Sequence, residues 1–389
     1  MDIEDYNLEH GSDIFIEYKD ENTTEERKSE IVDFLFNLTR TKGIPMVELN
    51  EYQIQDKLIE LSEITVDDVY SEVDGVWTYG FNTSCVNVLR QFFPEMNFVE
   101  KQGKPSVDRM YHNDYRYRRA IEKALRYSDS DINIFNWIIM IGAGYCYNFR
   151  PAVAKTIYEV WGKREGCKVF DSSAGYGARM LGAHMANNVS EYLGIDPNTS
   201  ESCTKLSTFL DGNFPTETKK QVLKMGSEDF TKERFPEYQG YFDLYFTSPP
   251  YFNTEMYSDD PSQSYKKFPK YDLWIKGFYR QTIYNACDAL KKDGVFIINI
   301  FEKIDVIRDV TKLFLADKGW YIISTEKYLL RTIPGSNHKF DEEGNPVIRD
   351  MTVGKNFEPI WIAKHYTQLY KEGLIDKDTC NLYEKRVVL

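Results

Sequence analysis

The chain has 389 residues, of which 42% are hydrophobic and 28% are charged. This composition is typical of a folded protein with two or three domains, and it excludes an intrinsically disordered chain. No apolar run approaches the roughly 18 residues of a membrane span. The N-terminus, Met1-Asp2-Ile3-Glu4-Asp5, is acidic where a signal peptide would be basic. We therefore expect a soluble, cytoplasmic protein.

The net charge of −13 is unevenly distributed. Residues 1–75 hold 21 acids and 6 bases, so the remaining residues hold 40 of the 61 acids and 42 of the 48 bases. The acidic region 1–75 is predicted to be helical, because Ile31, Phe34, Leu35 and Leu38 follow a helical spacing. A polyanionic partner is disfavoured by the charge of the whole chain, but not by that of the part after residue 75.

Residues 76–140 form a basic, tyrosine-rich region. Eight bases and only three acids lie between Lys101 and Tyr127, together with the four tyrosines Tyr111, Tyr115, Tyr117 and Tyr127. Bases neutralise phosphates and aromatic rings stack on bases, so this region is a candidate for nucleic-acid recognition. A solvated helix face with extended arginines would have the same composition.

From about residue 141 to residue 364, apolar strand-like runs alternate with helical segments, and a charged helical tail, 365–389, follows. Six runs are predicted to be strands: 168–170, 192–195, 241–246, 294–300, 320–324 and 359–363. Such alternation predicts an α/β fold with a doubly wound, mostly parallel sheet. Ligands of such sheets gather at the carboxyl ends of the strands.

The first predicted strand ends in a glycine loop, Asp171-Ser172-Ser173-Ala174-Gly175-Tyr176-Gly177. Its glycines permit a tight turn and a close approach to a ligand. The next strand ends at Asp196, 19 residues beyond Gly177, where an acid can bind a ribose diol. The loop lacks a third glycine and a Gly-Lys-Ser/Thr sequence, so an adenosine without a pyrophosphate fits better than NAD or ATP.

A later strand ends in Phe246-Thr247-Ser248-Pro249-Pro250-Tyr251. Consecutive prolines cannot continue a sheet, because each lacks an N–H group and fixes φ near −65°. The chain must therefore form a rigid turn, which presents the Ser248 hydroxyl, free carbonyls and the Tyr251 ring. This turn suits the binding of a flat polar group, although a packed turn that only ends a strand would look similar.

Together, the glycine loop, Asp196 and Ser248-Pro249-Pro250-Tyr251 resemble the S-adenosylmethionine-dependent methyltransferases that modify exocyclic amino groups of DNA bases. The resemblance covers roughly residues 145–364 and implies a class I, Rossmann-like catalytic domain with a seven-stranded sheet. Members of this family often carry Pro and Phe where Ser172 and Ser173 stand. They also usually place target recognition after the catalytic half, whereas the spare sequence here lies before it.

The resemblance implies two groups of site residues, one catalytic and one that binds the cofactor. The catalytic group is Ser248, Pro249, Pro250 and Tyr251. The cofactor-binding group combines the segment before the glycine loop, the loop itself, the ribose-binding acid and an adenine-contacting segment: Asn148, Phe149, Arg150, Asp171, Ser172, Ala174, Gly175, Gly177, Asp196, Pro197, Glu228, Asp229 and Phe230. No metal is implied, and the six cysteines contain no C-x-x-C pair.

The long polar connection Phe252–Tyr271 is predicted to act as a lid that contacts the substrate, although it could be a plain connecting loop. Its candidate substrate contacts are Phe252, Asn253, Tyr257, Gln263, Ser264, Lys266 and Lys267. A second connection, Arg331–Phe357, resembles a hairpin that family members turn toward the substrate. A base inside a duplex cannot reach such a pocket, so we expect base flipping or a single-stranded substrate.

The sequence therefore predicts a DNA methyltransferase, with N4-cytosine ahead of N6-adenine because Ser leads the Pro-Pro sequence. Enzymes of this family occur in restriction–modification pairs, and the sequence leaves open whether a cognate nuclease exists. Methylation at cytosine C5 is disfavoured, since that reaction needs a cysteine nucleophile and no Pro-Cys dipeptide occurs. Two alternatives stay open: an RNA base amino-methyltransferase, and a catalytically inactive module that binds cofactor and nucleic acid.

Overall fold

The computed structural model describes residues 12–44, 48–101, 103–127, 134–144, 148–300, 305–330 and 357–387. Contacts within the chain divide it into two compact units. The helical unit takes its residues from Met1–Asn50, Phe93–Tyr147 and Asn253–Asp259, and the sheet unit takes the rest. Both units are therefore assembled from separate stretches of the chain. The four consecutive regions predicted from the sequence do not coincide with these units, and their functional division stays a prediction.

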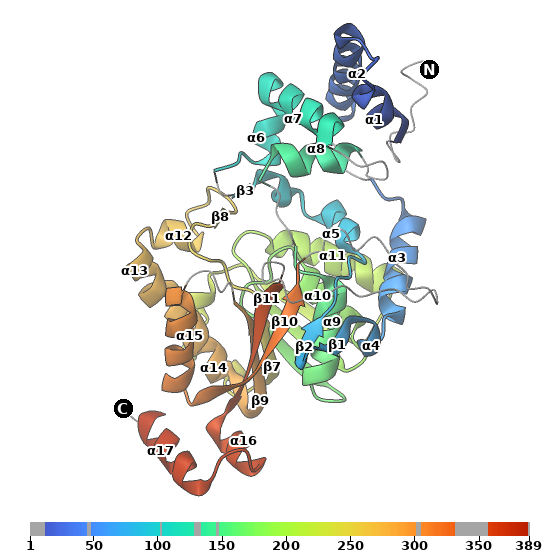
Figure 1. The fold of residues 1–389 in the computed structure, drawn as a ribbon. Coiled ribbons are helices and arrows are strands. Elements are labelled where there is room, and N and C mark those ends of the chain that lie inside the picture. Colours follow the sequence, from blue (N-terminus) through green and yellow to red (C-terminus); the bar gives the residue numbers. More distant parts are fainter. Residues whose placement is uncertain are drawn as a thin grey trace. The chain divides into compact units, whose positions relative to one another are not determined.

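The sheet unit is built on one mixed sheet with the strand order β1-β2-β10-β11-β9-β7-β4-β5-β6 (Figure 1). Neighbours from β9 to β6 run parallel, whereas β11 is antiparallel to both β9 and β10. The strands are β1 (Tyr70–Val73), β2 (Val76–Tyr79), β4 (Cys167–Asp171), β5 (Val189–Ile195), β6 (Lys219–Leu223), β7 (Phe242–Thr247), β9 (Leu290–Asn299), β10 (Trp320–Leu329) and β11 (Phe357–His365).

This architecture confirms the predicted α/β, doubly wound, mostly parallel, Rossmann-like fold, with one correction. In the described part of the chain the sheet has nine strands, whereas seven were predicted. The two additional strands, β1 and β2, form a hairpin in which Tyr70 faces Tyr79 and Val73 faces Val76. The hairpin joins the sheet because β2 pairs in parallel with β10 at Thr78 and Tyr79. Its residues come from a stretch that the sequence had placed outside the catalytic domain.

Helices connect and cover these strands. Pro151 begins α9, where its missing N–H group costs nothing. The α-helices of the sheet unit are α3 (Glu51–Glu63), α4 (Val66–Val69), α5 (Val86–Phe92), α9 (Pro151–Trp161), α10 (Ala178–Met185), α11 (Ser200–Asn213), α12 (Ser264–Lys267), α13 (Tyr271–Trp274), α14 (Arg280–Ala289), α15 (Asp305–Asp317), α16 (Tyr366–Lys371) and α17 (Lys377–Val387). Shorter turns are η3 (Ser227–Asp229), η4 (Pro236–Tyr238) and the π-helical η5 (Ile275–Tyr279).

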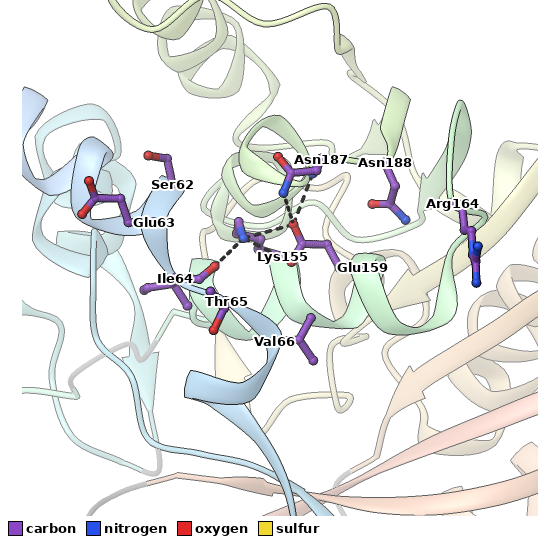
Figure 2. A pocket seen from close by; sticks show the side chains of 10 residues that line it. All are labelled: Ser62, Glu63, Ile64, Thr65, Val66, Lys155, Glu159, Arg164, Asn187 and Asn188. Carbon is purple, nitrogen blue, oxygen red and sulfur yellow. Dashed lines mark hydrogen bonds and ion pairs between the residues drawn. The ribbon is translucent and has the colours of Figure 1, made fainter.

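The amino ends and the carboxyl ends of the parallel strands carry different features. Beside the amino ends of β4 and β5 lies a cavity of about 420 Å³, lined by the end of α3, by α9 and by residues just before the two strands (Figure 2). The buried Lys155 crosses it, forming an ion pair with Glu159 at 3.0 Å and donating to the Ile64 carbonyl at 2.5 Å. The carboxyl ends of the same strands hold the sequence motifs.

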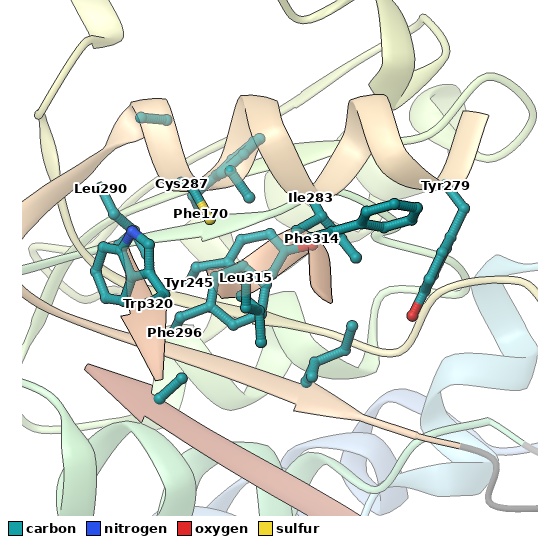
Figure 3. Packing of buried hydrophobic residues seen from close by; sticks show 14 of the residues in the cluster. Phe170, Tyr245, Tyr279, Ile283, Cys287, Leu290, Phe296, Phe314, Leu315 and Trp320 are labelled. Carbon is teal, nitrogen blue, oxygen red and sulfur yellow. The ribbon is translucent and has the colours of Figure 1, made fainter. Parts of the chain in front are cut away.

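The core of the sheet unit fills the space between the strands and the helices α14 and α15 (Figure 3). Tyr245 of β7 lies fully buried in this core, 4.5 Å from the Phe296 ring of β9. The next residue, Phe246, points to the other face, where its ring lies 6.1 Å from that of Tyr158 in α9. All of β7 is buried, as expected for a parallel strand covered on both faces.

The helical unit has a core of its own, formed by its helices. Its elements are α1 (Ser12–Lys19), α2 (Glu25–Lys42), η2 (Pro94–Phe98), β3 (Glu100–Lys101), α6 (Val107–Tyr111), α7 (Asp114–Tyr127), α8 (Ile134–Gly142) and β8 (Glu255–Met256). Thr24 caps α2 by accepting a hydrogen bond from the Arg27 N–H group. The strands β3 and β8 pair antiparallel, with Glu100 opposite Met256 and Lys101 opposite Glu255.

No helix within the described ranges is long and apolar enough to cross a membrane.

Candidate functional site

The predicted motifs follow four neighbouring strands of the sheet, β6, β5, β4 and β7. These strands are parallel, so their carboxyl ends lie at one edge of the sheet. The glycine loop follows β4, Asp196 follows β5, Glu228 and Asp229 lie shortly after β6, and Ser248 follows β7. Segments separated by up to about eighty residues in sequence thus meet at the edge where doubly wound sheets bind ligands.

Asp171, the first residue of the predicted cofactor loop, is fully buried and engaged by protein groups. Its carboxylate accepts hydrogen bonds from Arg179 at 2.8 Å, from the Tyr192 hydroxyl at 2.6 Å and from Thr247 at 2.9 Å. The Ser173 N–H group also donates to it at 3.1 Å. A carboxylate offers about four acceptor sites. The Asp171 side chain therefore holds the loop between β4, β5 and β7, and a ligand would meet the loop backbone.

Arg179 was not predicted from the sequence, yet it completes this arrangement. Burial opposes the charge of its guanidinium, but the Asp171 carboxylate raises the pKa of Arg179 above its ordinary value. The same guanidinium donates to the Ser173 carbonyl. The only signal in the sequence is a base two residues after the glycine loop, in the first turn of α10.

Glycine is required at two positions of the loop. Gly175 and Gly177 have φ values of +55° and +73°, in the left-handed region that other residues rarely adopt. The loop is held to the neighbouring strand end by a bond from the Ala174 N–H group to the Ile195 carbonyl at 2.9 Å. Gly177 is the N-cap residue of α10, so the first N–H groups of this helix lie next to the loop.

Asp196 connects the end of β5 to the glycine loop. Its Oδ2 accepts the Gly175 N–H group at 3.0 Å, and its Oδ1 accepts those of Asn198 and Thr199, both at 2.9 Å. Burial raises the pKa of Asp196 above its ordinary value, against the effect of these three bonds. The Thr199 side chain also hydrogen-bonds to this carboxylate, which is partly exposed. Pro197, also a predicted cofactor contact, follows directly and is partly exposed.

The segment before α9 also reaches this edge. Asn148 donates to the Tyr176 carbonyl of the glycine loop at 2.9 Å. The Phe149 ring stacks on Tyr328 of β10 at 4.7 Å. Arg150, by contrast, is buried, and its guanidinium donates to the carbonyls of Leu329 and Leu330. Asn148 is thus beside the loop, while Arg150 ties the segment to the end of β10.

Two predicted cofactor residues point into the protein. The Ser172 hydroxyl is buried and shares a hydrogen bond of 2.7 Å with the Tyr245 hydroxyl. The Phe230 ring is buried in the core, 4.8 Å from Phe170 and 4.7 Å from Phe235. Their predicted contact with a cofactor has no support from these positions, and each is explained by packing.

Glu228 and Asp229 form a pair of acids that share one base. Lys267 Nζ lies 2.7 Å from Glu228 Oε1 and 2.9 Å from Asp229 Oδ2. Burial opposes the charge on this ammonium group, but the two carboxylates raise the pKa of Lys267. Sequence reasoning had assigned Lys267 to the substrate and the acids to the cofactor. The ion pairs instead connect α12, in the predicted lid, to the acids after β6.

The turn after β7 is oriented by Asn299, the last residue of β9. The Ser248 hydroxyl donates to Asn299 Oδ1 at 3.1 Å, and the Tyr251 hydroxyl donates to the Asn299 backbone carbonyl at 2.8 Å. Pro249 is buried, whereas Ser248, Pro250 and Tyr251 are partly exposed. Asn299 was missed from the sequence, where its signal is one polar residue at the end of an apolar strand.

The predicted lid residues fall into both units. Phe252 has a φ of +53° and packs edge-on against Tyr271 at 5.4 Å and Trp274 at 5.9 Å. Asn253 and Tyr257 belong to the helical unit. The other predicted substrate contacts lie in the sheet unit, in or next to α12. Of these, Gln263 is buried and Lys266 is exposed. Ser264 accepts a hydrogen bond from the Trp274 indole N–H group at 3.1 Å. The second predicted loop, residues 331–356, lies outside the described residues.

The cavity of Figure 2 is separate from this site, because it lies beside the amino ends of β4 and β5. Within the described residues, no group of His, Cys, Asp and Glu side chains could hold a metal ion. The edge that carries the motifs offers backbone N–H groups, a partly exposed carboxylate, a hydroxyl of fixed direction and a phenol ring. Such a set of groups can bind a nucleoside-like ligand and orient a second polar group.

No protein-family model and no curated protein matches the sequence. Solved structures resemble the chain in fold, at low identity. TrmN from Thermus thermophilus is 11% identical, with a TM-score of 0.35, over 55% of this chain and 48% of that one. The chain thus spans about half the length of TrmN.

Two further structures have similar values. An S-adenosylmethionine-dependent O-methyltransferase from Thermotoga maritima is 15% identical, with a TM-score of 0.35, over 57% of this chain and 67% of that one. A branched-chain polyamine synthase from Thermus thermophilus is 12% identical, with a TM-score of 0.36, over 55% of each chain. Because the sequence identities and TM-scores of these three structures are low, the function has to be argued from the site of this chain.

Proposed function

We propose that the chain is an S-adenosylmethionine-dependent methyltransferase that acts on an exocyclic amino group of a DNA base, N4 of cytosine ahead of N6 of adenine. The observation that carries the proposal is the junction of the glycine loop, Asp196 and the Ser248 turn at one edge of the sheet. A cofactor half and a reacting half are thereby adjacent, as a two-substrate site requires.

The residues present fit the nucleoside part of the cofactor. The left-handed glycines Gly175 and Gly177 leave the loop backbone open to close approach. Asp196 is partly exposed beside this loop, where a carboxylate suits a ribose hydroxyl. Asp229 is partly exposed and offers an acceptor for an adenine amino group. When bound, the cofactor would supply an activated methyl group on a sulfonium.

The reacting half of the site, which is the turn at Ser248, explains why an amine is the target. An exocyclic amine is a poor nucleophile, because its lone pair is delocalised into the ring. Ser248 gives its own hydrogen to Asn299, so the lone pairs of its Oγ are directed away from Asn299 and can accept a hydrogen of the amine. The Pro249 carbonyl would accept the other hydrogen, and the Tyr251 ring would stack on the base. Alignment of this kind accounts for large rate gains.

The turn accepts a base only outside a double helix. An extruded or single-stranded nucleotide can enter, and an intact base pair cannot. The proposed reaction on duplex DNA therefore includes base flipping. Membership of a restriction–modification pair is a further part of the proposal, and it depends on a nuclease that recognises the same sequence.

The test is transfer of label from methyl-labelled S-adenosylmethionine to duplex DNA, single-stranded DNA and RNA. We expect label in DNA and, after digestion, N4-methylcytosine or N6-methyladenine by mass spectrometry. Label in RNA alone would replace DNA by RNA as the substrate. No transfer to any nucleic acid would contradict the proposal.

A variant separates an enzyme from an inactive binding module. Ser248→Ala is expected to keep cofactor affinity by calorimetry and to lose transfer by about 100-fold, as when one positioned contact to a transition state is removed. Ser207→Ala, at a partly exposed serine of α11, serves as the matched control and should leave transfer unchanged. Equal transfer by wild type and Ser248→Ala would exclude the proposed role of the turn.

A further inference from the structure

The helix α7 (Asp114–Tyr127) has two chemically opposite faces. One face packs into the core of the helical unit through the buried residues Tyr117, Ala120, Ile121, Ala124 and Leu125. The other face is exposed to solvent. It carries a basic stripe, which we define as Arg116, Arg119, Lys123 and Arg126.

The stripe is continuous and is flanked by aromatic rings. At 100° per residue, its four bases fall within an arc of about 80° along roughly 15 Å of helix. Tyr115 and Tyr127, whose exposed fractions are 74% and 64%, widen this arc to about 120°. The two acids of α7 are outside it: Asp114 pairs with Arg40 at 2.7 Å, and Glu122, beside the arc, pairs with Arg119 at 3.3 Å.

We infer that this face of α7 binds the phosphate backbone of a nucleic acid, with Tyr115 and Tyr127 stacking on unpaired bases at its ends. Four cationic side chains along 15 Å suit a nucleic-acid backbone, because its phosphates repeat a negative charge at close intervals. Exposed rings at both ends give a surface for bases, because every base has a π-face. Charge complementarity alone would also suit an acidic protein, but that partner gives no reason for the two rings.

This inference rests on the proposed function and adds a second contact surface to it. The chain itself links the two. Directly after Tyr251 and Phe252, the chain enters the helical unit as Asn253–Asp259, where β8 pairs with β3. The unit that carries the stripe therefore includes the residues that follow the proposed catalytic turn. A nucleic acid held by α7 is held by a unit that is covalently continuous with that turn.

The test uses the full chain with the triple substitution Arg116→Gln, Arg119→Gln and Lys123→Gln. Arg126 is kept because it hydrogen-bonds to Tyr18. The matched control neutralises three exposed lysines of the sheet unit, Lys205→Gln, Lys219→Gln and Lys232→Gln. Binding of a fluorescent oligonucleotide is measured by anisotropy over a range of KCl concentrations, with duplex DNA, single-stranded DNA and RNA in separate arms.

We expect the triple α7 variant to bind about 10- to 100-fold more weakly at 150 mM KCl. The slope of log affinity against log salt should become shallower by about 2 to 3, because three phosphate contacts are lost. The control should follow wild type. A wild-type slope in the α7 variant would overturn the inference, as would a control that weakens binding equally. Absence of nucleic-acid binding by the wild-type protein would also overturn it.

Two readouts separate this inference from the proposed function. Cofactor affinity and the thermal midpoint should be unchanged in the α7 variant, since the three substituted side chains are exposed to solvent. If methyl transfer occurs but the salt slope does not change, only the α7 inference fails. If the stripe binds nucleic acid but no transfer occurs, only the proposed function fails.

Discussion

The hydroxyl of Ser248 donates to Asn299 Oδ1 at 3.1 Å, and a carbonyl on a third strand fixes the direction of that bond. Asn299 Nδ2 donates to the Pro359 carbonyl at 3.2 Å. A carbonyl can only accept, so the amide nitrogen must face Pro359 and the amide oxygen must face Ser248. The Ser248 hydrogen is thereby assigned, and so is the side of Oγ that can accept a hydrogen from a substrate.

Replacement of Asn299 by Leu should therefore impair catalysis through Ser248. We expect the turnover rate to fall by about 10- to 100-fold while cofactor affinity is kept, because the hydroxyl loses its fixed orientation. The measurement is single-turnover methyl transfer, with cofactor binding by calorimetry. Unfolding should show a loss of about 0.5–1.5 kcal/mol, since the buried Pro359 carbonyl loses one of its two donors and keeps the Ile300 N–H group.

A double-mutant cycle distinguishes orientation from a general effect on the fold. Once Ser248 is an alanine, Asn299 has nothing to orient. The variant carrying Ser248→Ala and Asn299→Leu should then be no slower than Ser248→Ala alone. Fully additive losses would show that Asn299 acts independently of Ser248.

Lys267 and Lys266 are neighbours in sequence with different partners, which gives a matched pair of variants. Lys267→Met leaves Glu228 and Asp229 without their shared base, and we expect cofactor affinity to fall by several-fold as the two carboxylates repel each other. Lys266→Met should instead weaken nucleic-acid binding, because an exposed ammonium group beside the Tyr265 ring can neutralise a phosphate. Isothermal titration calorimetry measures the affinity of each variant for the cofactor and for an oligonucleotide. The assignment would be wrong if Lys266→Met weakened cofactor binding and Lys267→Met weakened nucleic-acid binding.

His184 should make stability depend on pH. Burial, reinforced by the charge of Lys220, lowers the pKa of His184 from 6.5 to about 4. Its Nε2 faces the Phe214 carbonyl at 2.8 Å, so Nε2 carries the hydrogen of the neutral ring. Between pH 6.5 and 4 the unfolded chain binds more protons at this residue than the folded protein does. The free energy of unfolding therefore falls as the pH drops through this window.

The variant His184→Gln keeps a donor for Phe214 and removes the titration. We expect the pH slope of its free energy of unfolding, measured by urea titration, to be smaller than that of wild type. The difference should be about 1.4 kcal/mol per pH unit within the window. Parallel pH profiles for the two proteins would show that His184 is not the titrating group.

Asp171 is expected to act on stability. Asp171→Asn leaves the buried Arg179 without its counter-charge, and the free energy of unfolding should drop by about 3–5 kcal/mol. The control, Asp288→Asn, breaks a more exposed pair with Lys318, so its cost should stay below about 1 kcal/mol. Urea unfolding compares the two. Similar losses for both would contradict a special role for the Asp171–Arg179 pair.

The sequence predicted the central strands because their runs are largely apolar and rich in aromatic and aliphatic residues. The runs at 241–246 and 294–300 correspond to β7 (Phe242–Thr247) and β9 (Leu290–Asn299). The hairpin β1–β2 was not predicted. Its strands are short, and their exposed residues, such as Trp77 at 45%, hide the alternation that identifies a strand.

In the site, the sequence predicted which strand ends carry ligand-binding residues, but not what each side chain contacts. Asp171 and Ser172 have the residue types of ligand contacts, and only the positions of Arg179 and Tyr245 show that both are held inside the protein. The role of Asn299 depends on pairing between strands that are distant in sequence. Spacing along the chain contains no information about such a pairing.

The strand β8 has a consequence for the order in which the protein folds. It pairs with β3, whose residues are made more than 150 positions earlier during synthesis. The ribosome must therefore complete the glycine loop and the Pro-Pro turn before the helical unit can acquire its last strand. A contact of this sequence separation is slow to form. The core of the helical unit contains no residue of β8, so its helices can pack on one another first and the short β3–β8 ribbon is the last part of the unit to form.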